Sequence, residues 1–258
     1  MSIANVNGVD IHYDLVGEQG PVLVLANSLG TDLVMWERQA EAFKDDFRVL
    51  RYNMRGHGSS GAPTGPYTIE LLSRDLLALI DYLGFSKFSF CGISLGGMVG
   101  QWLAINAGNK LDKLVLAATT PNFLSANFEE RIKTVREKGL AGIADNVVDR
   151  WFTRGFQEAA PRQVDRVAHM TTAASQAGYI ACCEALMAAN FEDSLSQIKT
   201  PTLCIVGIQD HATSVETVTA LANAISGAKL VVIADGAHLI NLEQPEEFNR
   251  ILRDFLEN

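Results

Sequence analysis

Short apolar segments alternate with stretches of helical period along much of this 258-residue chain. Six such segments are short and predominantly apolar on both faces, and they cover residues 22–25, 47–50, 88–91, 114–118, 202–206 and 230–233. Strands that are apolar on both faces are typical of a parallel sheet buried between layers of helices. Strands and helices that alternate in sequence form an α/β sheet with right-handed crossovers. The pattern therefore predicts an α/β fold with a mostly parallel central sheet.

The sequence also predicts the structure of the N-terminal segment and the bounds of two helices. Asn7 and Gly8 form a strong two-residue hairpin signal, and the residues after them alternate between apolar and polar. An apolar stripe along residues 69–83 predicts a helix that ends near Gly84. Pro245 is well suited to begin the last helix. We expect an antiparallel hairpin beside the parallel strands, with helices flanking the sheet.

The alternation of strands and helices stops between residues 122 and 196. This stretch shows helical periods and no strand-like run. We therefore expect residues 1–121 and 197–258 to form the α/β core. Residues 122–196 are expected to form an all-helical cap, inserted before the last strands.

Composition limits the partners and the compartment. The chain has 21 basic and 30 acidic side chains, which give a net charge of −9. Nucleic acids and anionic membranes attract basic surfaces, so we expect neither as a partner. The sequence makes no prediction of the oligomeric state.

Two further patterns bear on the surroundings of the protein. Residues 88–109 carry no charge, but only 12 of these 22 residues are apolar, so we interpret them as a buried strand and helix rather than a membrane span. The four cysteines lie in apolar runs without C-x-x-C spacing, which favours buried free thiols in a reducing compartment. With no secretory signal visible, we expect a cytoplasmic protein.

The most specific local motif is G-x-S-x-G at residues 92–96. It lies between the apolar segment 88–91 and a helical segment, the strand–turn–helix context in which this motif carries a nucleophile. On so sharp a turn Gly92 and Gly96 are needed, because a Cβ at either position would collide with the sheet or the helix. The Ser94 hydroxyl would lie at a helix N-terminus, which favours developing negative charge. We predict that Ser94 is the nucleophile.

A serine nucleophile needs a general base and a carboxylate that orients the base. Asp210 and His238 follow the fifth and sixth apolar segments, in the chain order serine, acid, histidine. The carboxyl ends of parallel strands meet at one edge of a sheet, so these loops can converge on Ser94. Asp235 is the alternative acid, but it lies only three residues before His238, and strand topology favours Asp210.

The remaining histidines are weaker candidates for the base. We expect His57 to brace a loop near the site, whereas His12 lies in the hairpin and His169 in the helical insertion. His211 adjoins Asp210 and is either a solvated loop residue or a substrate contact.

An oxyanion hole requires two backbone N–H donors. One is expected from Leu95, the residue after the nucleophile. The other is expected from Leu29, in the loop that follows the first apolar segment. The sequence contains no metal-binding motif and no nucleotide-binding glycine loop after the first strand, so no metal or cofactor is expected.

Seven stretches match a known family: NSLGTD at 27–32, RGHG at 55–58, GPYTIE at 65–70, FCGISLGGM at 90–98, RWFT at 150–153, GYIACC at 178–183 and AHLINLEQP at 237–245. Together they resemble the α/β-hydrolase fold and, more narrowly, the 3-oxoadipate enol-lactonases of aromatic-compound catabolism in the β-ketoadipate pathway. The similarity runs almost end to end and includes the cap, where unrelated hydrolases diverge most.

The resemblance implies hydrolysis of a five-membered enol lactone with an acetate arm to give 3-oxoadipate. The substrate would be a small lactone that bears a carboxylate, and neither a cofactor nor a metal would be needed. Because the chain is acidic overall, the site must supply local positive charge for that carboxylate. The candidates are Arg150 and Arg154, four residues apart on one helix face, and we expect at least one of them to bind the acetate arm, with Trp151 covering the ring.

The sequence departs from the family pattern at three places: Asn53, the loop 209–213 that contains His211, and the segment Thr119 to Asn122. The last two border the expected site and bear on substrate identity more than on the reaction class. The scaffold also allows a carboxylesterase, a carbon–carbon-bond hydrolase, a perhydrolase or a non-catalytic ligand receptor, because a fold does not fix a function.

Overall fold

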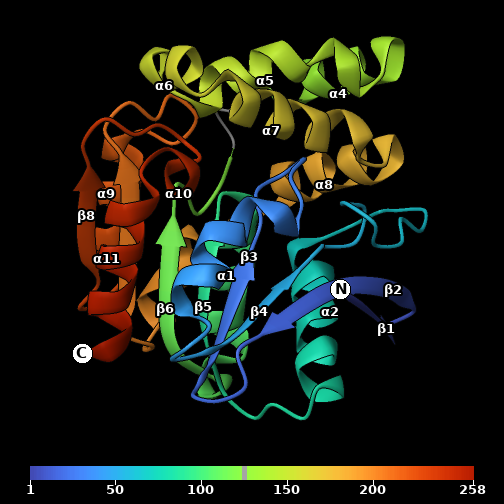
Figure 1. Ribbon diagram of the computed structural model, residues 1–258. Helices are drawn as coiled ribbons and strands as arrows, with labels where there is room; N and C mark the ends of the chain where they lie inside the picture. Colours follow the sequence, from blue (N-terminus) through green and yellow to red (C-terminus); the bar gives the residue numbers. More distant parts are fainter. Residues whose placement is uncertain (124–126) are drawn as a thin grey trace.

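The computed structural model describes residues 1–123 and 127–258 (Figure 1). Its centre is an eight-stranded sheet with the strand order β1-β2-β4-β3-β5-β6-β7-β8. The strands are β1 (Ser2–Val6), β2 (Val9–Val16), β3 (Val22–Ala26), β4 (Arg48–Tyr52), β5 (Phe88–Ile93), β6 (Leu111–Ala117), β7 (Thr202–Gly207) and β8 (Lys229–Ile233). All six predicted apolar segments therefore coincide with strands.

The strands of the sheet run in both directions. β1 pairs with β2 and β2 pairs with β4 in antiparallel fashion, whereas the remaining neighbours are parallel. Asn7 and Gly8 join β1 to β2 with φ values of 48° and 74°, as a type I′ turn requires. The predicted hairpin and the mostly parallel sheet are both confirmed.

Helices cover the sheet and its upper edge in Figure 1. α1 and α11 pack against each other, and α3 packs against α2, β5 and β6. The α-helices are α1 (Glu37–Phe43), α2 (Ile69–Tyr82), α3 (Leu95–Asn106), α4 (Phe128–Lys138), α5 (Ala144–Trp151), α6 (Arg154–Ala159), α7 (Pro161–Ala173), α8 (Gln176–Ala188), α9 (Val215–Ala224), α10 (Ile240–Glu243) and α11 (Pro245–Glu257). The expected helices at 69–83 and from Pro245 correspond to α2 and α11.

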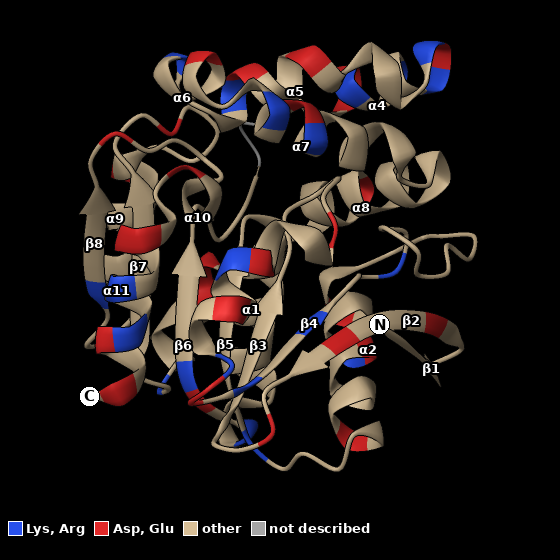
Figure 2. Cartoon of the chain, viewed as in Figure 1, with Lys and Arg blue, Asp and Glu red and all other residues tan. Residues whose placement is uncertain are grey.

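The central strands are buried along their whole length. Every residue of β3, β5 and β7 is buried, and none of these strands carries a charged side chain (Figure 2). The uncharged stretch 88–109 forms β5 and then the buried helix α3, as predicted. In the part of the chain that the structure describes, no helix has the length and apolar character needed to cross a membrane. The four cysteines are buried free thiols.

Helices α4 to α8 follow β6 and precede β7, and they lie over the edge where the parallel strands end (Figure 1). A β-bridge between Asn122 and Asn190 brings the two ends of this insertion together. The division into a core and a cap at 122–196 stays a prediction, and residues 124–126 of that range lie outside the described residues.

Candidate active site

Ser94 occupies a strained turn between β5 and α3. Its φ of 56° and ψ of −110° place a non-glycine residue in an unfavourable backbone region. Its N–H donates to the Ala117 carbonyl at 3.0 Å, which fixes the turn on β6. A Cβ at Gly92 would overlap the Gly96 backbone, and one at Gly96 would overlap the Ala26 carbonyl. The glycines of the motif therefore permit the close packing that holds the serine in this conformation.

Asp210 and His238 form a buried hydrogen-bonded pair. His238 Nδ1 lies 2.9 Å from Asp210 Oδ2, and the other carboxylate oxygen accepts the N–H groups of Ala212 at 2.7 Å and Thr213 at 2.9 Å. Burial alone would raise the pKa of Asp210, but His238 and the hydrogen bonds from Thr213 outweigh it and hold the pKa below its usual value. An ionised Asp210 accepts the Nδ1 proton, which leaves His238 Nε2 as the acceptor nitrogen.

The alternative acid, Asp235, lies elsewhere. It is exposed, and its carbonyl accepts a hydrogen bond from the Gln244 side chain at 2.9 Å. The structure therefore places Asp210, and not Asp235, against the imidazole of His238.

The two predicted oxyanion donors come from different segments: Leu29 from the loop after β3, and Leu95 from the start of α3 directly after Ser94. Leu29 and Ser94 line one small cavity, and Leu95 is the first residue of α3. The next amide on each loop is already engaged: Gly96 donates to the Asn27 carbonyl at 3.1 Å and Gly30 donates to His57 Nε2 at 3.0 Å. These bonds fix both loops and leave the Leu29 and Leu95 amides as the candidate oxyanion donors.

His57 braces the Leu29 loop, as predicted. Its Nδ1 lies 3.3 Å from the Arg55 carbonyl, while its Nε2 accepts from Gly30. Burial lowers the pKa of His57 to about 4, so the ring is neutral at pH 7 and retains an acceptor nitrogen. This histidine supports the site from below and does not reach the reacting atoms.

The inner cavity above Ser94 is small and is closed by residues of the insertion. Its volume is about 40 Å³, and Ser94, His238, Arg131, Arg150 and Trp151 are among the residues that line it. The Trp151 indole stacks on the imidazole, with ring centroids 6.4 Å apart and planes 18° apart. One aromatic side chain therefore forms the wall next to the candidate base.

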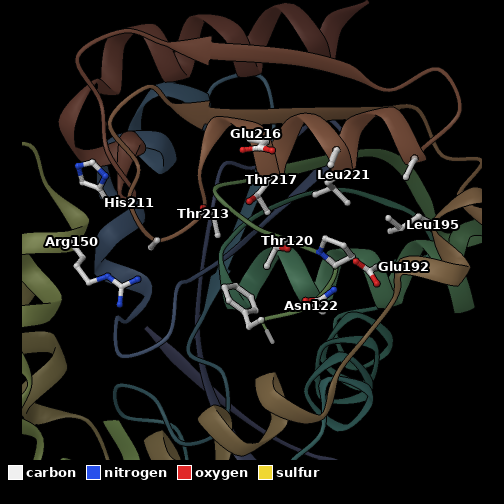
Figure 3. A pocket seen from close by; sticks show the side chains of 15 residues that line it. Thr120, Asn122, Arg150, Glu192, Leu195, His211, Thr213, Glu216, Thr217 and Leu221 are labelled. Atoms are coloured by element: carbon white, nitrogen blue, oxygen red, sulfur yellow. The ribbon is translucent and has the colours of Figure 1, made fainter. Parts of the chain in front are cut away.

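A larger outer pocket of about 780 Å³ lies beside the inner cavity (Figure 3). Arg150 and His211 lie at one end of it, and Glu192 and Leu195 lie at the other. Arg150 lines both spaces, as do Phe123 and Ala212, so the two spaces adjoin at these residues. His211 lines the outer pocket and is exposed.

The expectation that Arg150 and Arg154 share one helix face is wrong. α5 ends at Trp151, and Phe152 is extended with φ −128° and ψ 147°. Thr153 then caps a separate helix, α6. The Arg154 side chain is 92% exposed and pairs with Glu158 at 2.9 Å, so the structure does not bring it to the cavity.

Arg131 on α4 is the cation that sequence reasoning missed. It lines the inner cavity with Arg150, and its guanidinium lies 5.1 Å from the centre of the Phe128 ring. Burial and the neighbouring Arg131 charge lower the pKa of Arg150. Among the described residues, no carboxylate lies within 4.0 Å of either guanidinium. The available signal was a single arginine beside the apolar stripe of the helix 128–138.

The atypical residues near the site have structural partners. The Asn53 side-chain carbonyl accepts the Leu33 N–H at 2.7 Å. The Thr119 hydroxyl donates to the Ser94 carbonyl at 2.8 Å, directly beneath the elbow. Ser28 belongs to a stretch that matches the family, and its buried hydroxyl has no hydrogen-bond partner within the described chain; the residue lines the inner cavity.

The described residues contain no group of three or more His, Cys, Asp and Glu side chains that could hold a metal ion. The sheet topology and the strand–turn–helix position of Ser94 define the class: this is an α/β hydrolase.

Comparison with known proteins places the chain more narrowly. The family described as "alpha/beta hydrolase fold" matches residues 21–245. The 3-oxoadipate enol-lactonase 2 of Acinetobacter baylyi is 40% identical, over 93% of this chain and 91% of that protein. The 3-oxoadipate enol-lactonase 1 of the same organism is 32% identical, over 99% and 96% of the two chains. The crystal structure of the enol-lactonase from Burkholderia xenovorans is 38% identical, covers 100% of both chains and superposes with a TM-score of 0.97.

The chain therefore belongs to the α/β-hydrolase family, in the group that contains these enol-lactonases.

Proposed function

We propose that this enzyme hydrolyses 3-oxoadipate enol-lactone, a five-membered lactone with a carboxylate arm, to 3-oxoadipate. The observation that carries the proposal is the buried His238–Asp210 pair at the same strand ends as the elbow serine. The names of the relatives supply the substrate, and the similarity to them spans the helical insertion as well as the sheet.

In the proposed mechanism His238 Nε2 takes the hydroxyl proton of Ser94, and the serine oxygen attacks the lactone carbonyl. Asp210 stabilises the imidazolium that forms. The amides of Leu29 and Leu95 donate to the oxyanion of the tetrahedral intermediate. Collapse breaks the ring C–O bond, and the departing enol oxygen takes the proton from His238. The same imidazole then takes a proton from water, which attacks the acyl-enzyme, and the imidazolium passes that proton to the departing Ser94 oxygen. The released carboxylic acid still carries the enol, which tautomerises to the ketone of 3-oxoadipate.

Replacing the nucleophile tests the reaction class. We expect Ser94→Ala to lower kcat by about 10⁴-fold or more while the protein stays folded. Ser89→Ala is a matched control, because Ser89 is also buried in β5. Lactone consumption and p-nitrophenyl acetate hydrolysis measure the effect. Turnover by a folded Ser94→Ala protein would rule out the acyl-enzyme mechanism, and no turnover by the wild type would favour a ligand receptor.

We further propose that Arg150 and Arg131 bind the carboxylate of the substrate, with Trp151 against the lactone ring. Both cations line the cavity that contains Ser94, and neither has a carboxylate partner among the described residues. Arg131 is half-buried and Arg150 is exposed. A cation at the wall of a cavity without a carboxylate partner favours an anionic ligand, because the two can form a charge-assisted hydrogen bond. Arg154 is left out of this subsite because of its 92% exposure.

Substrate charge tests the proposed subsite. We expect the acid substrate to exceed its uncharged methyl ester in kcat/KM, with an advantage that shrinks as salt rises. Arg150→Gln should remove most of this advantage, by about 10-fold or more in kcat/KM, as expected for a charge-assisted bond. Arg154→Gln is the matched control and should leave it unchanged. Equal kcat/KM for the acid and the ester at every ionic strength would mean that shape or neutral donors carry recognition.

We also propose that residues 122–196 act as a cap that selects the substrate, and that the enzyme works in the cytoplasm. The arginines and the tryptophan of the proposed subsite all come from this stretch. The four buried free thiols fit a reducing compartment.

A further inference from the structure

Glu243 is a buried carboxylate close to His238 that the proposed reaction does not use. It ends α10 and is 7% exposed. Its Oε2 accepts the N–H of Ala237 at 2.5 Å, and its Oε1 accepts the N–H of Thr153 at 2.7 Å. Each oxygen therefore binds a different segment: one precedes the candidate base, and the other joins α5 to α6.

A second bond joins the same two segments. The N–H of Leu239 donates to the Trp151 carbonyl at 3.1 Å. The residues on both sides of His238 are thus tied to residues 151–153, and the Trp151 ring stacks on the imidazole between these ties. These hydrogen bonds fix the imidazole of His238 and the indole of Trp151 relative to each other.

Burying the ionised carboxylate of Glu243 at this position costs free energy. Burial raises the pKa of Glu243, although the N–H groups of Ala237 and Thr153 partly oppose the shift. None of the ion pairs among the described residues includes Glu243, and the charged group whose field reaches it is Asp210, which has the same sign. A neutral side chain would fill the same space without this cost. The presence of a buried carboxylate that accepts two N–H groups therefore calls for an explanation.

We propose that Glu243 is a positioning residue that sets the orientation of His238 against Ser94 and Trp151 by accepting both N–H groups. The inference rests on the proposed role of His238 as general base. It requires both oxygens to be acceptors, which an ionised carboxylate provides and an amide does not.

Three substitutions separate position from charge. In Glu243→Gln the NH₂ group must face one of the two N–H donors, whichever way the amide lies, so one bond is lost. Glu243→Asp keeps the charge but is one methylene too short to reach both donors. Glu243→Leu removes both bonds. Glu246→Gln is the matched control, because Glu246 is a neighbouring glutamate whose side chain is 87% exposed.

The experiment measures kcat and KM on enzyme whose active sites have been titrated with a serine-directed reagent, well below the unfolding temperature. We expect kcat to fall about 10-fold in Glu243→Gln and Glu243→Asp and about 100-fold in Glu243→Leu, since misplacement by about 1 Å costs that much. KM should change less than about twofold. Glu246→Gln should match the wild type.

Parallel assays with p-nitrophenyl acetate keep this test independent of the natural substrate. If the lactone is not turned over but the ester is, the substrate assignment fails while Glu243 is still tested through Ser94 and His238. In the pH profile of kcat/KM, the variants should show the same acid limb as the wild type but a lower plateau. Unchanged kcat in the Gln and Asp variants would overturn the proposal. A pH profile of kcat/KM whose acid limb is displaced while its plateau is unchanged would also overturn it, because the charge of Glu243 and not the position of His238 would then matter. If Glu243→Leu fails to fold, the Gln and Asp variants decide.

Discussion

Asp210 is held by more groups than His238 alone. Two backbone N–H groups and the Thr213 hydroxyl also donate to its carboxylate. We expect Asp210→Asn to lower kcat by about 10²–10⁴-fold, because the amide no longer fixes the productive tautomer of His238 or stabilises the imidazolium. Asp235→Asn should change kcat less than about twofold, since that side chain is exposed. Steady-state kinetics of both variants check this, and a larger loss in Asp235→Asn would assign the acid to the other loop.

At the residue scale the sequence could identify groups whose local context is specific. Ser94 stands in a turn that few other sequences form, and Asp210 and His238 follow recognisable strands. Arg131 and Glu243 offered no comparable signal. Their importance depends on what α4 and α10 face in the folded chain, and helical spacing alone does not contain that information.

At the scale of elements, α8 packs directly on the loop that contains His57. A Cβ on Gly56 would lie 2.7 Å from the Gly178 Cα, so the helix and the loop touch backbone to backbone. This contact supports the loop whose histidine holds the Gly30 amide. The position of α8 therefore affects, through His57, the position of the loop that contains Leu29.

Two glycine-to-alanine substitutions test this contact. Gly178→Ala should destabilise the protein by about 1–3 kcal/mol, because overpacking outweighs the gain in helix propensity. Gly155→Ala should stabilise it by about 0.5–1 kcal/mol, because that α6 glycine has nothing within 4 Å of its added Cβ. Thermal unfolding would show a lower Tm for the first variant and an equal or higher Tm for the second. Equal Tm shifts in both would show that the contact is loose.

Element boundaries were harder to predict than element types. The strands and α2 agree with the sequence pattern because a strand period or an apolar stripe is repeated over several residues. The end of α5 at Trp151 has no such repeated pattern: no glycine or proline lies within three residues of it, and its local sign is Thr153, which caps α6. The break coincides with the tertiary hydrogen bond from the Thr153 N–H to Glu243, 90 residues away, which the local sequence does not show.

For the molecule as a whole, one buried histidine makes stability depend on pH. The pKa of His57 is about 4 in the folded protein, against an ordinary value of 6.5 that applies once the chain unfolds. Between these values the unfolded chain binds the extra proton, so the free energy of unfolding should fall as pH drops from about 6.5 to about 4. The loss over this whole pH range is about 3 kcal/mol.

Urea unfolding at several pH values measures this effect. His57→Gln should have a flatter profile across the same window, because glutamine does not titrate. The raised pKa of Glu243 acts in the opposite sense and is present in both proteins, so the comparison removes it. Parallel profiles for the wild type and His57→Gln would assign the acid sensitivity to other groups.

The paired ends of the insertion suggest a natural seam for exchanging caps between hydrolases. Asn122 and Asn190 lie side by side, and a foreign helical segment could be joined there with little disturbance of the sheet. Hydrogen bonds from Thr153 to Glu243 and from Leu239 to Trp151 are nevertheless among those that join the insertion to the His238 loop. If only the inserted residues were exchanged, the loop that contains His238 would keep side chains that fit the original residues 151–153 and not those of the new segment. If the insertion selects the substrate as proposed, the unit that would have to be exchanged, in the laboratory or in evolution, is discontinuous and includes residues 150–153 together with 237–243.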